Sequence, residues 1–147
     1  LLNQLLAANP NGKPVPGRAE PQVLVLCPTR ELAQQVTADA INLVKFARGI
    51  RIATIMGGMP YGKQISQIKG ANLVVATPGR LLHHVDEVQA FTLRTVCHVV
   101  LDEADRLLEM GFADAVVCGA VDTICGLTCS AGLFVLVTIF VRPWRTS

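Results

Sequence analysis

The sequence predicts an α/β fold in which a parallel sheet is flanked by helices. Short apolar runs, of a length that suits strands buried on both faces, alternate with segments whose apolar residues recur at helical spacing. Four such runs each end in a polar or glycine-rich segment, and a helical pattern follows. Strands that alternate with helices indicate βαβ units, whose parallel strands share one sheet. With 147 residues, the chain is long enough for one domain with a buried core.

The predicted strands are the apolar runs at residues 22–28, 50–56, 71–77 and 97–104. Helices are predicted after them, at residues 29–47, 60–69, 78–85 and from 105 onward. Thr29 suits the N-cap of the first of these helices, and Pro78 suits the first position of the third. Residues 1–8 indicate the back half of a helix, and residues 9–21 predict a loop. The expected buried face of the first complete helix is Leu32, Val36, Ala40, Leu43 and Val44.

Charge and cysteine content narrow the classes of function. The chain carries 13 basic and 11 acidic residues, which excludes a strongly basic tail as the main binding device but allows a local phosphate-binding face. Its 5 cysteines form no C-x-x-C pair, so they are interpreted as buried, reduced thiols of an intracellular protein and not as a metal site. There is no signal peptide, and Leu1 falls inside a helical pattern, so the chain is expected to be a piece of a longer protein.

An acidic cluster follows the fourth predicted strand, in the stretch "HVVLDEADRLLEMGF". Asp102, Glu103 and Asp105 stand at or just beyond the carboxyl end of that strand, where ligands bind in parallel sheets. Phosphoryl transfer needs a divalent metal on the phosphates and a group that orients or deprotonates the attacking water, and two adjacent carboxylates can divide these tasks. Taken alone, the acids also suit a helix N-terminus, where they complement the helix dipole.

Three further segments follow the other strands: "PTRE" at 28–31, the glycine pair at 57–58 and "TPGR" at 77–80. The first and third place an arginine and backbone N–H groups at a helix N-terminus, which suits an anion. The glycines would let a phosphate backbone approach closely. Each segment taken singly is also compatible with ordinary turn and cap chemistry. His83 and His84, just beyond the third segment, are interpreted as solvated helix residues.

Together, "PTRELAQQV", "GG", "ATPGRLL" and "VLDEAD" resemble, in order and rough spacing, the first RecA-like domain of DEAD-box RNA helicases. The resemblance covers residues 1 to about 117 and implies a RecA-like fold of the P-loop NTPase type. It implies ATP and Mg²⁺ as cofactors, RNA as a partner held by its sugar-phosphate backbone without sequence preference, and ATP-driven remodelling of RNA duplexes or RNA–protein complexes. The flanks of the acidic motif are similar to the nucleolar, ribosome-biogenesis branch. That similarity implies pre-ribosomal protein partners and a nuclear or nucleolar location, with the cytoplasm as the alternative.

The resemblance also implies a role for each motif residue. Asp102 would hold Mg²⁺, through water, and Glu103 would position the attacking water, so these two are the expected catalytic residues. Asp105 would link this motif to its neighbours, and the three acids form the expected cofactor-binding set. Arg30 and Arg80 are the expected phosphate contacts, and the Arg-Glu pair of PTRE is also expected to fix local structure. The RNA-binding face implied in full is Pro28, Thr29, Arg30, Glu31, Gly57, Gly58, Thr77, Pro78, Gly79 and Arg80.

The chain departs from the family pattern near its amino end. "NGKPV" contains Gly12-Lys13 but lacks the earlier glycine and the Ser/Thr of a P-loop, and the adenine motif is also missing. By the resemblance, the domain at residues 1–117 is therefore expected to be partial, incomplete at its N-terminus and without its central strand. The second RecA-like domain is absent too, so the fragment is expected to be inactive. The alternative is a catalytically inactive RNA-backbone-binding module or a truncated isoform.

The tail, residues 118–147, has almost no charge and lacks the Ser-Ala-Thr that the family would place here. Three interpretations are open. The tail is a non-homologous end from an unspliced intron, an alternative exon or a frame change; or it is a divergent helix and strand, with "LFVLVTIF" as a buried strand; or it is a membrane segment, since residues 123–141 carry no charged side chain. A membrane anchor is not expected on an RNA-helicase domain.

Overall fold

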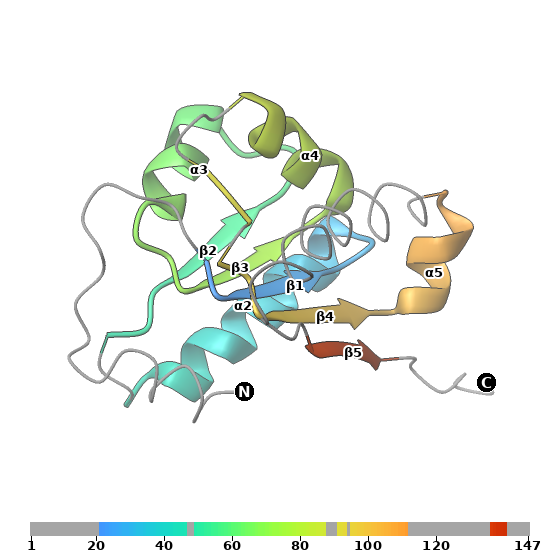
Figure 1. Cartoon of the computed structure of the whole chain (residues 1–147), viewed down its shortest axis with the longest axis horizontal. Coiled ribbons are helices and arrows are strands. Elements are labelled where there is room, and N and C mark those ends of the chain that lie inside the picture. Colours follow the sequence, from blue (N-terminus) through green and yellow to red (C-terminus); the bar gives the residue numbers. More distant parts are fainter. Residues whose placement is uncertain (1–20, 47–48, 88–90, 94, 112–135, 141–147) are drawn as a thin grey trace, which may run out of the picture.

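The structure, a computed structural model, describes residues 21–46, 49–87, 91–93, 95–111 and 136–140. Five strands form one sheet, with the order β2-β3-β1-β4-β5 (Figure 1). Every neighbouring pair is parallel, which confirms the predicted sheet. The strands are β1 Val23–Leu26, β2 Ile52–Ile55, β3 Leu73–Ala76, β4 His98–Asp102 and β5 Leu136–Phe140.

Four helices connect or follow the strands, and they confirm the four helices predicted between residues 29 and 110: α2 Arg30–Val44, α3 Tyr61–Ile68, α4 Pro78–Glu87 and α5 Ala104–Glu109. Helix α2 begins where predicted, because Oγ1 of Thr29 accepts a hydrogen bond from the Leu32 amide at 3.2 Å. Helix α4 begins at Pro78, whose fixed φ suits the first helical position and whose missing N–H is not needed there.

The sheet has a buried core on each face. Leu24 and Leu26 of β1 face the core that also holds residues of α3, α4 and α5. Val23 and Val25 of the same strand face the opposite core, which is covered by α2. Strand β1 is therefore buried along its whole length, as its unbroken apolar run predicted. The two cores fix the sheet between helices on both sides, which is the RecA-like α/β arrangement (Figure 1).

One detail of the prediction is wrong. It concerns the buried face of α2, where Leu43 is 72% exposed. The expectation that a strand of the family fold is missing stays a prediction, since residues 1–20 lie outside the described residues. Among the described strands, β1 pairs directly with both β3 and β4, so this part of the sheet is continuous and its edges are β2 and β5.

The tail contributes one described element. Strand β5 pairs with β4 in parallel register, with Leu101 opposite Ile139 and Asp102 opposite Phe140. For residues 136–140, the structure therefore agrees with the interpretation of the tail as a sheet strand. The remaining tail residues, residues 1–20 with their P-loop lookalike, and three of the five cysteines lie outside the described residues. Within the described part, Cys27 is buried and Cys97 is half-buried, and no helix has the length and apolar character needed to cross a membrane.

Candidate functional site

The carboxyl ends of β1 to β4 lie at one edge of the sheet, because all four strands run in the same direction. The segments that follow these strands in the chain therefore meet at this edge. The PTRE segment at 28–31 follows β1, the glycine pair at 57–58 follows β2, and the TPGR segment at 77–80 follows β3. Glu103 follows β4. Topology thus brings together four motifs that are far apart in the sequence.

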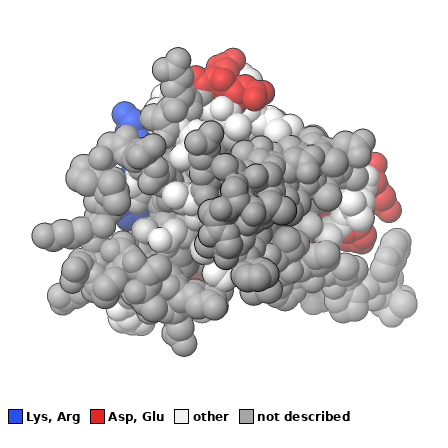
Figure 2. All heavy atoms as spheres, in the orientation of Figure 1, with Lys and Arg blue, Asp and Glu red and all other residues white. Residues whose placement is uncertain are grey.

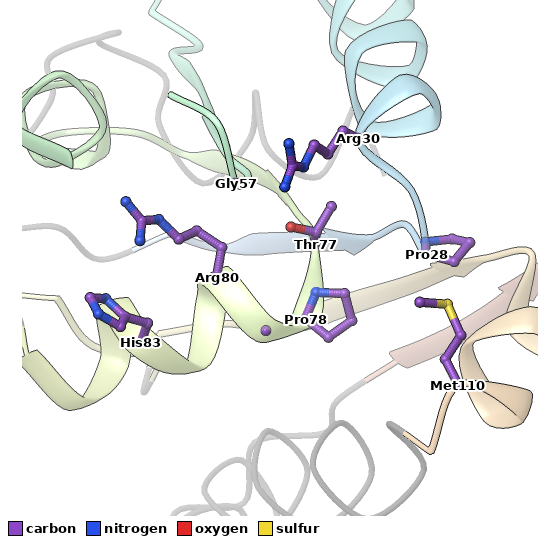
Figure 3. A pocket seen from close by; sticks show the side chains of 9 residues that line it. Pro28, Arg30, Gly57, Thr77, Pro78, Arg80, His83 and Met110 are labelled. Carbon is purple, nitrogen blue, oxygen red and sulfur yellow. The ribbon is translucent and has the colours of Figure 1, made fainter. Parts of the chain in front are cut away.

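A pocket of about 330 Å³ opens at this edge, between the N-terminal ends of α2 and α4 (Figure 3). Seven of the ten residues predicted for the RNA-binding face line this pocket, and they come from all three segments: Pro28, Arg30, Gly57, Thr77, Pro78, Gly79 and Arg80. Two further lining residues, His83 and Met110, were not predicted. None of the nine is acidic, so the two arginines dominate the charge of the pocket wall.

The three predicted residues that do not line the pocket have other places. The hydroxyl of Thr29 is engaged in capping α2. Glu31 is exposed in the first turn of that helix, where its charge complements the helix dipole. Gly58 adopts φ +84° in the turn after β2, a conformation that favours glycine. These three residues shape the segments around the pocket and do not face into it.

Arg30 lies directly over the glycine pair. A Cβ atom built on Gly57 would lie only 2.9 Å from Nη2 of Arg30, and one built on Gly58 would lie 3.1 Å from Nη1. Figure 3 shows the Arg30 side chain reaching from the start of α2 toward Gly57. The absence of side chains at 57–58 therefore makes room for the guanidinium group. Arg30 thus lines the pocket and lies against the glycine pair, whereas its expected part in fixing local structure stays a prediction.

Arg80 projects from the first turn of α4 (Figure 3). Its guanidinium carbon lies 5.0 Å from the centroid of the Tyr61 ring, which is a cation–π distance. The Nε atom of Arg80 is buried and has no hydrogen-bond partner in the described structure. The Tyr61 ring therefore helps to orient the guanidinium group at the pocket wall.

The two histidines of α4 differ, and the interpretation of both as solvated is wrong for His84. His83 is exposed, lies 3.4 Å from the Glu87 carboxylate and lines the pocket. It stands four residues after Gly79, so both lie on one helix face, and this spacing is a signal that could have found it. His84 is fully buried against the Tyr61 ring, at 4.5 Å between ring centroids. Met110, beyond the end of α5, carried no comparable sequence signal.

The acidic motif stands beside the pocket, at the end of β4. Asp102 is the last residue of the strand, and Asp105 is exposed in the first turn of α5. Glu103 between them has φ 51° and ψ 53°, and it is the one non-glycine residue with positive φ in the described part of the chain. Such a left-handed conformation costs roughly 1–2 kcal/mol for an L-residue, so the tight connection from β4 to α5 is maintained against a local penalty.

The acids suit Mg²⁺ only in combination with other ligands. In the described residues, no group of three or more His, Cys, Asp or Glu side chains could hold a metal by itself. Mg²⁺ ordinarily binds through one or two carboxylates, with water and phosphate oxygens completing its shell. Asp102 and Glu103 are half-buried neighbours at a strand end, which fits this mode.

Acidic side chains on the face shown in Figure 2 gather over α4 and α5. The sequence of these helices contains Asp86 and Glu87 in the first and Asp105 and Glu109 in the second. The basic residues of the pocket wall belong instead to the first turns of α2 and α4. The pocket wall is thus locally basic, although other basic residues, such as Arg51 and Arg106, lie elsewhere on the described structure.

Comparison with known proteins agrees with this geometry. Residues 2–123 match the family model of the DEAD/DEAH box helicases. The chain is 47% identical to the ATP-dependent RNA helicase DbpA of Escherichia coli over 96 residues, which cover 65% of this chain and 21% of DbpA. It is 48% identical to Nucleolar RNA helicase 2 of Rattus norvegicus over 101 residues, which cover 68% of this chain and 12% of that protein. The chain thus spans about a fifth or less of these relatives.

Among solved structures, the yeast DEAD-box splicing factor Prp28 superposes with a TM-score of 0.76 at 27% sequence identity. The superposition covers 96% of this chain and 32% of the Prp28 chain. Prp28 therefore shares the arrangement of strands and helices that is seen in this chain.

Proposed function

This chain belongs to the DEAD/DEAH box helicase family, and on that premise we propose that its pocket holds the sugar-phosphate backbone of RNA. The observation that carries the proposal is the convergence of three separate motifs on one pocket, with an arginine at each of two helix N-termini. Contacts to phosphate and sugar fix the position of a nucleic acid without reading its bases. The whole RNA-binding face comprises the ten residues named from the sequence, with Thr29, Glu31 and Gly58 acting as supports.

The acidic motif serves ATP hydrolysis in this proposal. Members of the family use ATP, generally with Mg²⁺, and the metal when bound neutralises charge on the phosphates. Asp102 would hold the ion through water, Glu103 would orient the attacking water, and Asp105 would link the motif to its neighbours. The strained backbone of Glu103 supports a functional role, because left-handed non-glycine residues cluster at active sites.

The parent protein would be an ATP-dependent RNA helicase that remodels RNA duplexes or RNA–protein complexes. Residues 1–117 would form part of its first RecA-like domain, and residues 118–147 a tail of separate character. A ribosome-biogenesis role, with pre-ribosomal partners and a nucleolar location, rests on the flanks of the acidic motif.

A second candidate function is that of an inactive module that binds RNA backbone without turnover. The observation that favours it is the sequence itself, which contains no Gly-x₄-Gly-Lys-Ser/Thr stretch to cradle phosphates. Both candidates require the same RNA-binding pocket, so the first test concerns binding.

The test is the salt dependence of affinity for a single-stranded oligouridine, measured by fluorescence anisotropy on the 147-residue chain. Each phosphate neutralised on a single strand contributes about −0.7 to the slope of log K against log salt. Arg80→Ala is expected to make the slope less negative by about that amount, and Arg30→Ala to do the same. Arg30→Lys keeps the charge and should keep the slope, which separates phosphate contact from bracing of the loop.

Arg51→Ala is the matched control. Arg51 is exposed and lies just before β2, so it is at the amino ends of the strands, whereas the pocket is at their carboxyl ends. It should leave the slope unchanged. Equal slopes for the unmutated chain, Arg30→Ala and Arg80→Ala would overturn the assignment of the pocket to RNA. A preference for one base sequence over another would also contradict it.

A further inference from the structure

Two polar side chains are fully buried between α3 and α4. Gln64 of α3 and His84 of α4 each have 0% of their surface exposed, and they are the buried polar residues of the described structure. Burying such groups without hydrogen bonds costs roughly 1–3 kcal/mol each. Their partners therefore indicate what this part of the fold is organised to hold.

Gln64 fastens both ends of the glycine loop. Its Nε2 atom donates one hydrogen bond to the carbonyl oxygen of Met56 at 3.0 Å and another to that of Met59 at 2.9 Å. These two carbonyls flank the glycine pair at 57–58, which follows β2. A side chain from the next helix thus spans the loop and uses both of its amide hydrogens to do so.

The other end of Gln64 reaches α4. Its Oε1 atom lies 3.1 Å from Nε2 of His84. Because both amide hydrogens of Gln64 are already donated, Oε1 accepts this bond and the histidine donates it. His84 is therefore the Nε2–H tautomer, with its buried Nδ1 left without a partner. Burial, and then the Arg80 charge, lower the pKa of His84 to about 4, so the ring is neutral at pH 7.

The linkage continues to the pocket wall. His84 stands one helical turn after Arg80, and its ring stacks on Tyr61 with an interplanar angle of 8°. The same Tyr61 ring carries the Arg80 guanidinium group at 5.0 Å. The glycine loop and the arginine of TPGR are thus joined through Gln64, His84 and Tyr61.

We propose that Gln64 is a positioning residue that presets the glycine loop against α4, so that the pocket is formed before RNA arrives. The proposal rests on the proposed function of the pocket. A loop with two adjacent glycines has more backbone freedom than other sequences, and ordering it on binding would reduce affinity. An apolar residue could fill the same space without any desolvation penalty, so the buried amide is explained by the three hydrogen bonds that it makes.

The experiment replaces Gln64 by Met, which has a similar volume but neither donor nor acceptor. Backbone ¹⁵N relaxation of the 147-residue chain reports the order parameters of Gly57 and Gly58. These should fall from about 0.85, typical of rigid backbone, toward 0.6. Affinity for single-stranded oligouridine should fall about three- to tenfold with an unchanged salt slope, since no charge is removed.

Ser66→Ala is the matched control on the same helix, because Ser66 also donates to a carbonyl, that of Lys63 at 2.7 Å, but does so at the surface. It should change neither the order parameters nor the affinity. His84→Leu should reproduce the effects of Gln64→Met, whereas His84→Gln, which retains an amide donor, should restore them in part. These two variants test the linkage from its other end if Gln64→Met does not fold.

Unchanged order parameters in Gln64→Met and His84→Leu would overturn the proposal. Reduced order with unchanged RNA affinity would overturn the positioning role. If the unmutated 147-residue chain binds no RNA, the proposed function of the pocket is refuted. The order parameters would still decide whether Gln64 holds the loop. In the unmutated chain, ¹⁵N chemical shifts that place the His84 proton on Nδ1 would contradict the inferred hydrogen bond.

Discussion

At the scale of single residues, Gly79 offers a test of the proposed contact between the pocket and RNA. It is the second residue of α4 and lines the pocket. Apart from its chain neighbours and the backbone of its own helix, no described atom lies within 4 Å of the place where its Cβ would be. Glycine in a helix is less stable than alanine by roughly 0.5–1 kcal/mol. Neither strain nor crowding in this structure requires a glycine there, so the open space itself is what a close-lying RNA backbone would use.

Gly79→Ala should therefore have opposite effects on stability and binding. Unfolding free energy should rise by about 0.5 kcal/mol, because the helix gains a better helix former, while RNA affinity should fall several-fold, because the methyl group enters the pocket. Urea unfolding and anisotropy titration measure the two quantities. Gly62→Ala is the control, since Gly62 is also the second residue of its helix and has equally open surroundings, but does not line the pocket. A Gly79→Ala chain with undiminished RNA affinity would contradict a close approach of RNA.

The sequence could identify Gly79 and its neighbours because they belong to a contiguous motif, whose chemistry can be interpreted without knowing the fold. It could not separate His83 from His84. The two residues are adjacent in one helix, and only the placement of α4 against α3 decides that the first meets solvent and the second meets Gln64. Such distinctions depend on the rotation of a helix about its axis, which a short amphipathic pattern defines to within one residue at best.

At the scale of elements, α3 and α4 are joined by a buried neutral histidine, and this has a consequence for stability. The groups around His84 that influence its proton are Arg80 and His83, which disfavour the charged ring, and Glu87, which favours it. With desolvation as the largest cause, the pKa of His84 in the folded chain is lowered from 6.5 to about 4. The unfolded chain therefore binds this proton more readily than the folded chain does.

Stability contributed by this difference is complete above pH 6.5 and is lost as the pH falls from 6.5 toward 4. The expected loss over that window is on the order of 3 kcal/mol, since each unit of pKa difference corresponds to about 1.4 kcal/mol. Urea unfolding at a series of pH values measures it. His84→Gln should show a smaller loss, with the remainder due to other groups, such as His98, whose pKa burial also lowers. Identical pH profiles for the two chains would show that His84 does not titrate in this way.

The sequence predicted the described elements well where the apolar pattern agrees with the residues that begin or end an element. Strands β1 and β3 are unbroken apolar runs, and α2 and α4 begin at a capping threonine and a proline. The end of α2 was less predictable, because Leu43 keeps the helical spacing of the apolar residues before it and yet is exposed. Periodicity predicts the direction in which a side chain points, whereas burial also requires a neighbouring element that packs against that turn of the helix.

At the scale of the whole molecule, the position of β5 could not be derived from its residues. An apolar run of this kind suits a buried strand, a buried helix or a membrane segment equally well by pattern alone. What distinguishes them is pairing with another strand, and β5 pairs with β4 along its full length. The strand that carries the acidic motif is thereby enclosed on both sides, by β1 and by β5. Asp102 consequently ends an inner strand and not an edge strand.

Catalysis, in contrast, needs parts that the 147 residues do not contain. Positioning and charge neutralisation supply most of the catalysis of phosphoryl transfer, and the sequence has acids for the metal and water but no phosphate-cradling loop. The chain should therefore show no ATPase activity, with or without RNA, in a phosphate-release assay. Hydrolysis that is stimulated by RNA and abolished by Glu103→Gln would contradict this expectation.

In a longer protein that restores the missing loop and a second RecA-like domain, Glu103→Gln should leave ATP affinity nearly unchanged and reduce turnover by at least about 100-fold, because the residue acts on water and not on the nucleotide. Glu109→Gln is the isosteric control, since Glu109 is exposed at the end of α5. Nucleotide binding by fluorescence and single-turnover hydrolysis separate the two steps. Loss of ATP binding with slow turnover retained would reverse the roles, making Glu103 a nucleotide contact and leaving Asp102 as the residue nearest the reaction.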